Sequence, residues 1–178
     1  MGIIVVTTKI YRQAQEKLAE YQAYASPKTG LAHFSSSVGI DLSCYAETEA
    51  IPYQKTNSIA SVNQCFKAQN ISINNLKQQH MLGGPYPLFV GSGATVAKQL
   101  ISYLDYTGIH GFNLTHTVAP ESHQDFIGDV IPELQSRGGY KTAYEERSLR
   151  HKLLGQGDRL PSNHPVHHYR INQNFVSP

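Results

Sequence analysis

The chain has 178 residues, of which 40% are hydrophobic and 16% charged, a composition typical of one folded domain with a core of its own. Its net charge of +2, carried by scattered Lys and Arg residues, does not indicate binding to nucleic acid or to an anionic membrane surface. No apolar run approaches the roughly 20 residues of a membrane span, and the N-terminus lacks the basic region of a signal peptide. We therefore expect a cytoplasmic protein.

The first predicted elements are a strand and a helix. Residues 2–7 (GIIVVT) form a short apolar run rich in β-branched residues, which is typical of a strand buried on both faces of a parallel sheet. Residues 10–24 predict a helix, which Ser26-Pro27 ends. Its apolar face is expected to carry Ala14, Leu18, Tyr21 and Ala25, and its solvent face Arg12, Glu16, Lys17 and Glu20.

Residues 28–70 show no sustained periodicity and are rich in Ser, Thr, Gly and Tyr, so we predict an irregular insertion of loops and short turns. With a short helix predicted at 72–79, the insertion covers about residues 28–80. Its apolar residues are expected to fold over the open side of the sheet, namely Leu31, Phe34, Val38 and Ile40.

The second half of the chain repeats the order of strand and helix. A strand is predicted at 88–90, then a helix capped by Ser92 and ended by Gly108. A strand at 111–114 and a helix at about 123–137 follow, and Pro132 is expected to kink that helix or to remove one of its hydrogen bonds.

Strands that alternate with helices predict an α/β fold with a parallel sheet. The short connection between Gly108 and Gly111 leads us to expect that the strands at 88–90 and 111–114 are parallel and adjacent. We predict one domain over residues 1–139 and a C-terminal extension over 140–178, with a short helix at 145–154 and a surface tail.

Three patterns have simpler explanations than catalysis. Gly91-Ser92-Gly93 lacks the Gly-Lys-Ser/Thr element of a phosphate-binding loop, so Ser92 is better explained as a helix cap. Pro165 argues against a helix that would align the neighbouring histidines, and no Cys or carboxylate joins them, so we predict no metal site at His164, His167 and His168. Neither cysteine, Cys44 or Cys65, has metal-type spacing or a nucleophile signature.

Four polar residues are candidates for a substrate pocket. Asn113, Thr115 and His116 are expected at the C-terminal end of a parallel strand, where barrel enzymes carry their chemistry, and His80 joins them as a further candidate. The alternative is that these groups cap strand ends and bind water.

Several segments together resemble one family, the bacterial luciferase-like monooxygenases. FVGSGATVAKQL is similar to the family element in which a strand, Gly-Ser/Thr-Pro-Glu and a helix follow one another, although Gly93-Ala94 stands where Pro-Glu is usual. The segment from GIHGFNLTHT to RSLRHKLLG resembles the closing part of the branch of nitrilotriacetate, dibenzothiophene-sulfone and long-chain alkane monooxygenases, as does the tail LPSNHPVHHYR. AQEKLAEYQAYASPKTGLAHFSSSVGIDLSCY is similar to the upstream helix and its Gly-Ile-Asp-Leu-Ser segment.

The resemblance implies an incomplete (β/α)8 barrel, with GIIVVT, LFV and GFNL as about strands six to eight. Members of this family bind reduced FMN from a separate flavin reductase and insert one oxygen atom of O2 into a small organic substrate. No residue of this sequence matches the family's flavin contacts, which implies that strands one to five carry them.

Three hypotheses follow. An N-terminal barrel half completes the site in trans, or the chain is a catalytically silent remnant, or it is a binding module that recruits a partner through an exposed sheet edge. For an unclosed barrel we also expect that Ile4, Val6, Phe89 and Phe112 lose the opposite wall and that the isolated chain is aggregation-prone, oligomeric or partly molten.

Overall fold

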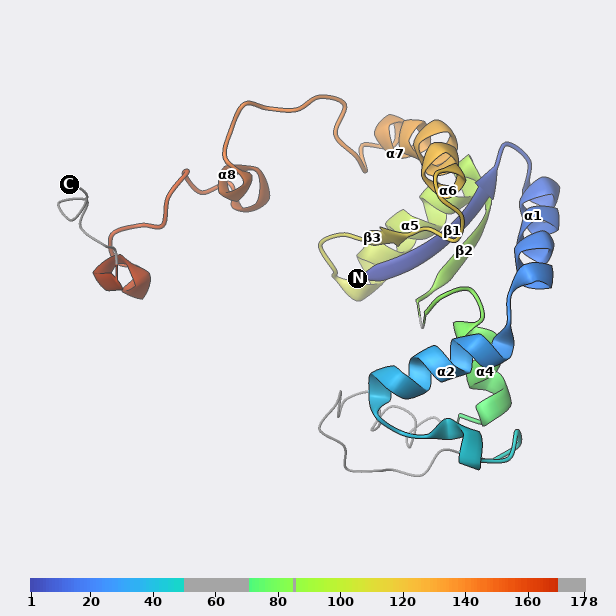
Figure 1. The fold of residues 1–178 in the computed structure, drawn as a ribbon. Coiled ribbons are helices and arrows are strands. Elements are labelled where there is room, and N and C mark those ends of the chain that lie inside the picture. The colour runs from blue at the N-terminus through green and yellow to red at the C-terminus, as the bar shows by residue number, and fades with distance from the viewer. Residues whose placement is uncertain (50–70, 85, 170–178) are drawn as a thin grey trace, which may run out of the picture. The chain divides into compact units, whose positions relative to one another are not determined.

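The computed structural model describes residues 1–49, 71–84 and 86–169, which belong to two compact units, Met1–Tyr140 and Lys141–Pro178. The first unit is built on a parallel sheet of β1 (Gly2–Thr8), β2 (Leu88–Ser92) and β3 (Asn113–Thr115), with helices between the strands (Figure 1). This confirms the predicted α/β class and the three predicted strands.

The strand order is β2-β1-β3, so β1 is the central strand. The strands predicted at 88–90 and 111–114 are parallel, but the expectation that they are neighbours is wrong, because both pair with β1 instead. β1 carries β3 along its first half (Gly2↔Asn113 to Ile4↔Thr115) and β2 along its second half (Ile4↔Leu88 to Thr8↔Ser92). The apolar β1 sequence suits this place, because a central parallel strand buries both faces.

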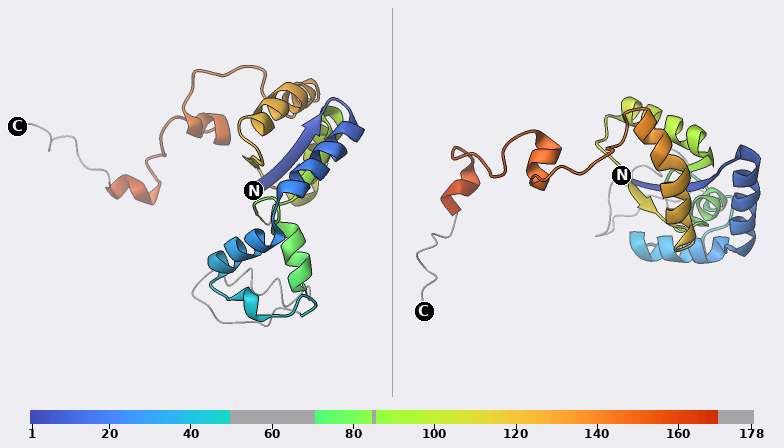
Figure 2. Two further views of the ribbon diagram at one scale, coloured as in Figure 1. Left: turned by 45° about the vertical axis from the view of Figure 1, so that its right-hand side comes forward. Right: turned by 90° about the horizontal axis from the view of Figure 1, so that it is seen from above.

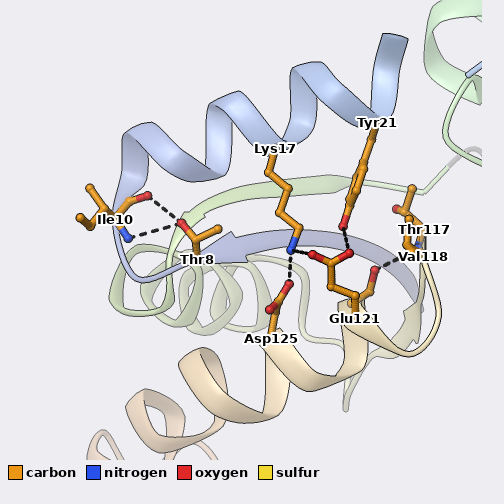
Figure 3. A network of polar contacts seen from close by, with 9 residues as sticks. Thr8, Ile10, Lys17, Tyr21, Thr117, Val118, Glu121 and Asp125 are labelled. Carbon is orange, nitrogen blue, oxygen red and sulfur yellow. Dashed lines mark hydrogen bonds and ion pairs between the residues drawn. The ribbon is translucent and has the colours of Figure 1, made fainter. Parts of the chain in front are cut away.

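Helices cover the sheet on both sides. α1 (Tyr11–Tyr24) lies on one side, and α5 (Gly93–Thr107) lies on the other together with the helical segment that follows β3 (Figure 3). Ile3 and Val5 of β1 pack against Val96, Ala97 and Leu100 of α5. Ile4 and Val6 point the other way and are each 2% exposed, so the expectation that these two side chains lose a covering wall is wrong.

α5 has the predicted boundaries. The Ser92 hydroxyl accepts the N–H of Thr95, and Gly108 ends the helix with a φ of 68°, the left-handed conformation that glycine adopts without strain. At the first turn the backbone lies against the chain of residue 129: a Cβ placed on Gly93 would be 2.0 Å from the Asp129 carbonyl oxygen. Only glycine permits this approach, because a Cβ would overlap the Asp129 carbonyl oxygen.

The last helix of the unit consists of three joined segments, α6 (Glu121–Asp125), a π-helical turn labelled η2 (Phe126–Val130) and α7 (Ile131–Ser136). The N–H of Ile131 bonds to the carbonyl of Phe126, five residues back, directly before Pro132. Proline has no N–H and its ring clashes with the preceding turn, and the wider π register accommodates it. The predicted irregularity at Pro132 is therefore confirmed.

The insertion is more regular than predicted. Residues 27–38, expected as loops, form helix α2 (Pro27–Val38), in which Ser26 caps the N-terminus and Pro27 occupies the first turn. A 3₁₀ turn (Leu42–Cys44) and α4 (Ile73–His80) follow, and α2 and α4 lie side by side (Figures 1 and 2). Residues 50–70 of the insertion lie outside the described residues.

The insertion has a core of its own, made by Leu31, Phe34, Val38, Ile40, Leu42, Ile73 and Leu76. The expectation that its apolar residues fold over the sheet is therefore wrong. They pack on one another, because α2 places Leu31, Phe34 and Val38 on one helical face opposite α4.

In the second unit, α8 (Leu149–Leu154) and a 3₁₀ turn (Pro165–Tyr169) are joined by non-helical chain (Figure 2). Ser148 caps α8 and Gly155 ends it with a φ of 63°. None of the helices in the described part of the chain is both long and apolar enough to cross a bilayer.

Candidate functional site

Ligands of open α/β sheets bind outside the carboxyl ends of the strands, at the point where neighbouring strands send their helices to opposite faces. Here that point lies between β1 and β3. α1 follows β1 onto one face, and α6 follows β3 toward the other (Figure 3). The residues that gather there are therefore the first to consider as a site.

A network of four side chains joins the two helices at this point, and we call it the Lys17 network (Figure 3). Lys17 of α1 pairs with Asp125 and, at 2.5 Å, with Oε1 of Glu121, both on α6. The Tyr21 hydroxyl, one turn further along α1, donates to Glu121 Oε2 at 3.4 Å. Both oxygens of Glu121 are thus engaged by α1.

Burial and charge fix the protonation states in this network. The Lys17 side chain is only 14% exposed, against 49% for Glu121. Burial alone would lower the pKa of Lys17, but hydrogen bonds to Asp125 and Glu121 outweigh it and raise the pKa above its ordinary value. The bond from Lys17 holds the pKa of Glu121 below its ordinary value. At neutral pH the ammonium and the Glu121 carboxylate are both charged, so neither has the pKa near 7 that suits a general acid or base.

Hydroxyl groups bond to the backbone at the carboxyl edge of the sheet. The Ser122 hydroxyl accepts the N–H groups of Thr117 and Val118 at 3.3 and 3.1 Å, and so fixes the turn between β3 and α6. On the β1 side, the Thr8 hydroxyl donates to the carbonyl of Ile10 at 2.8 Å, at the start of α1. The buried hydroxyls of Thr7 and Thr117 have no hydrogen-bond partner among the described residues.

Three of the predicted pocket residues lie in β3 or directly after it, but they do not converge. Asn113 begins β3 rather than ending it and is paired with Gly2, so it lies toward the amino end of the sheet. Thr115 ends the strand and is half-buried. His116 is exposed, and its ring centroid lies 5.1 Å from that of His123 on α6.

His80 lies in the core of the insertion. It is the last residue of α4, is 3% exposed, and its ring packs 4.1 Å from that of Phe34. Nδ1 lies 2.9 Å from the Leu76 carbonyl, which makes Nδ1 the donor, and Nε2 has no partner among the described residues. Burial lowers the pKa of His80. The structure thus does not bring His80 together with the three residues of the β3 segment.

Two hollows lie elsewhere in the described part of the chain. One of about 570 Å³ is lined by α2 and the following turn, from Lys28 to Ser43, with Lys77 of α4. A groove of about 640 Å³ follows β2 and α5, lined by Phe89, Lys98 and Tyr103 among others. No group of three metal-binding side chains occurs in the described ranges. Among the described residues at the carboxyl edge, Glu121 and Asp125 both pair with Lys17, and the exposed Lys9 directly follows β1.

Sequence reasoning missed the Lys17 network. It placed Lys17 on the solvent face and Tyr21 on the apolar face of one helix, and it gave Glu121 and Asp125 no role. The available signal was the matching spacing: Lys17 and Tyr21 are four residues apart, as are Glu121 and Asp125, so each pair shares one helical face. Spacing alone does not show that these two helical faces meet, because their meeting depends on the strand order.

No protein-family model matches the chain. Its sequence is 37% identical over 95% of its length to the long-chain alkane monooxygenase of Geobacillus thermodenitrificans, and 33% identical over 96% to the dimethyl-sulfide monooxygenase of Hyphomicrobium sulfonivorans. The crystal structure of the long-chain alkane monooxygenase matches 95% of the chain with a TM-score of 0.73. A riboflavin lyase with modified FMN and riboflavin matches 96% with a TM-score of 0.81 at 26% identity.

The chain spans about a third of these proteins, 35% and 36% of the two monooxygenase sequences and 38% of the lyase chain. Its relatives are luciferase-like FMN-dependent monooxygenases, as the resemblance implied, and the partial coverage is consistent with a C-terminal part.

Proposed function

We propose that this chain, a member of the luciferase-like FMN-dependent monooxygenase family, supplies the C-terminal part of a two-component enzyme of that family. The observation that carries the proposal is the match of nearly the whole chain to about a third of each relative. The complete enzyme would take reduced FMN from a separate flavin reductase and insert one oxygen atom of O2 into a small organic substrate. The flavin supplies the oxygen chemistry when bound, and the protein orients it and excludes water.

Within such an enzyme this chain contributes scaffold and one side of the pocket. β3 and the turn after it bring Thr115 and His116 to the carboxyl edge of the sheet, where barrel enzymes bind their substrates. Thr115 and His116 are the candidates for substrate contact at this edge, whereas Asn113 lies toward the amino end of the sheet and His80 in the insertion core. No residue of this sequence matches the flavin contacts of the family, so we propose that the chain alone does not bind the flavin and is inactive. The N-terminal barrel half, in the same polypeptide or in trans, would carry that site.

The test compares the chain alone with the chain in a completed barrel. Purified chain is titrated into FMN, and flavin fluorescence is followed. The same measurement is made after co-expression with the N-terminal two thirds of the long-chain alkane monooxygenase, a relative at 37% identity. We expect no saturation at micromolar chain alone and retained flavin in the co-purified complex. Saturable binding by the chain alone would contradict the proposal.

A second candidate is a non-catalytic module that recruits a partner through a sheet edge. β2 favours it, because within the described residues β2 pairs only with β1, and Leu88 on it is 38% exposed. A pull-down that returns a protein without any barrel sequence, together with failure of the co-purification, would support this candidate instead.

A further inference from the structure

We propose that Lys17 is a positioning residue, which holds the turn at residues 116–120 in place at the carboxyl edge of the sheet. The inference rests on the proposed function for the identity of the pocket, but the effect on the turn is a property of this chain alone. Lys17 touches no predicted pocket residue and would act through Glu121 and Asp125.

The turn at residues 116–120 leads directly into α6, the first segment of the helix that continues through η2 and α7. α6 begins after Pro120 without a side-chain cap. The first turn of a helix has N–H groups without intrahelical partners, so this end depends on contacts from outside the helix. The first and last residues of α6, Glu121 and Asp125, are the two that Lys17 binds. The ammonium therefore anchors both ends of α6 to the longer helix α1.

Ser122 connects α6 to the turn at residues 116–120. Glu121 is held by Lys17 and Tyr21, and the neighbouring Ser122 is 5% exposed, with its hydroxyl accepting the N–H groups of Thr117 and Val118. These two amides belong to the turn that begins with His116. Figure 3 shows Lys17 with Glu121 and Asp125, and the turn that carries Thr117 and Val118 beside α6.

The geometry excludes two other roles for Lys17. Lys17 does not form the kind of exposed surface ion pair that contributes little to stability, since its side chain is 14% exposed and pairs with two carboxylates. It is also no general base, because its bonds to both carboxylates keep it protonated at neutral pH. Removal of the ammonium would leave Glu121 and Asp125 near each other without a cation, and their repulsion would favour the opening of α6.

The test is amide hydrogen exchange in the full chain, in the wild type and in Lys17→Met. We expect the exchange of the Thr117 and Val118 amides to rise at least about tenfold in Lys17→Met, while the β1 amide of Val5 changes much less. Lys17→Arg, which retains the charge, is expected to restore at least half of the protection on a logarithmic scale. The matched control is Arg12→Met, which removes an ion pair to Glu16 on the same helix whose Arg12 side chain is 87% exposed. That variant should leave the exchange of all three amides unchanged.

Two outcomes would overturn the inference. Equal acceleration at Thr117, Val118 and Val5 would mean that Lys17 contributes only to global stability. Unchanged exchange at Thr117 and Val118 in a Lys17→Met protein that remains folded would mean that Ser122 holds the turn without Lys17. Neither outcome depends on flavin, so failure here and failure of the proposed function are separate results.

Discussion

Replacing Gly93 by alanine tests the packing of α5 against the π-helical turn. The added Cβ would lie 2.0 Å from the Asp129 carbonyl oxygen and 2.6 Å from its carbonyl carbon. Close carbon–oxygen contacts in proteins lie near 3.3 Å, so the two backbones would have to separate by about 1.3 Å. Neither neighbour is a flexible side chain, so rotation of a rotamer cannot relieve the clash.

The separation would loosen Val96 and Val130, two fully buried residues of the sheet core. We expect Gly93→Ala to lower the free energy of unfolding by about 1–3 kcal/mol, the usual range for overpacking. The assay is urea unfolding followed by circular dichroism. The matched control is Gly128→Ala in the π-helical turn that α5 packs against, where a Cβ meets nothing within 4 Å. Alanine there should be neutral or stabilising by up to about 1 kcal/mol.

A Gly93→Ala protein as stable as the wild type would refute the packing described for α5. Equal destabilisation by both alanines would also refute it, because the effect would then not depend on the contact with Asp129, which only a Cβ on Gly93 makes.

Three further predictions concern the insertion and the Lys17 network. Leu76→Ala should cost about 2–5 kcal/mol in urea unfolding, because Leu76 is fully buried in the insertion core, whereas Leu153→Ala, at an exposed position, should cost less than about 0.5 kcal/mol. The pKa of His80 is lowered in the folded state. The stability that neutral His80 contributes is therefore complete above its unfolded pKa of about 6.5 and is lost as the pH falls below that value. His80→Phe should make the free energy of unfolding depend less on pH between pH 7 and 5, and an unchanged dependence would contradict this. The pKa of Glu121 is also lowered in the folded state, so the stability that its carboxylate contributes is present above about pH 4.5 and is lost on acidification. In Glu121→Gln the Tm should therefore fall less between pH 5 and lower pH than it does in the wild type.

Elements with strong local signals could be predicted from the sequence. α5 has a capping serine, a continuous apolar face and a C-terminal glycine, and its boundaries at Ser92 and Gly108 are confirmed. α2 was missed because Pro27 was interpreted only as the end of the previous helix. Proline also suits the first turn of a new helix, and Leu31, Phe34 and Val38 carry helical spacing.

The strand order was not predictable from local patterns. Every strand is short, and the expectation that successive strands are neighbours ignored the possibility that β1 accepts partners on both edges. The position of the Lys17 network follows from that order. A lysine on a helix usually faces solvent, and only the neighbouring α6 makes Lys17 a partly buried partner of two carboxylates.

The claim that this chain is a functional part of a flavin monooxygenase is tested most directly by a hybrid enzyme. The C-terminal third of the long-chain alkane monooxygenase is replaced by this chain, and the hybrid is supplied with FMN, a flavin reductase, NADH, a long-chain alkane and ¹⁸O₂. The account predicts ¹⁸O in the alcohol product from the hybrid, and none from this chain alone or from the truncated relative. A folded hybrid that retains FMN but transfers no ¹⁸O to the alkane would contradict it, and so would ¹⁸O transfer by this chain alone.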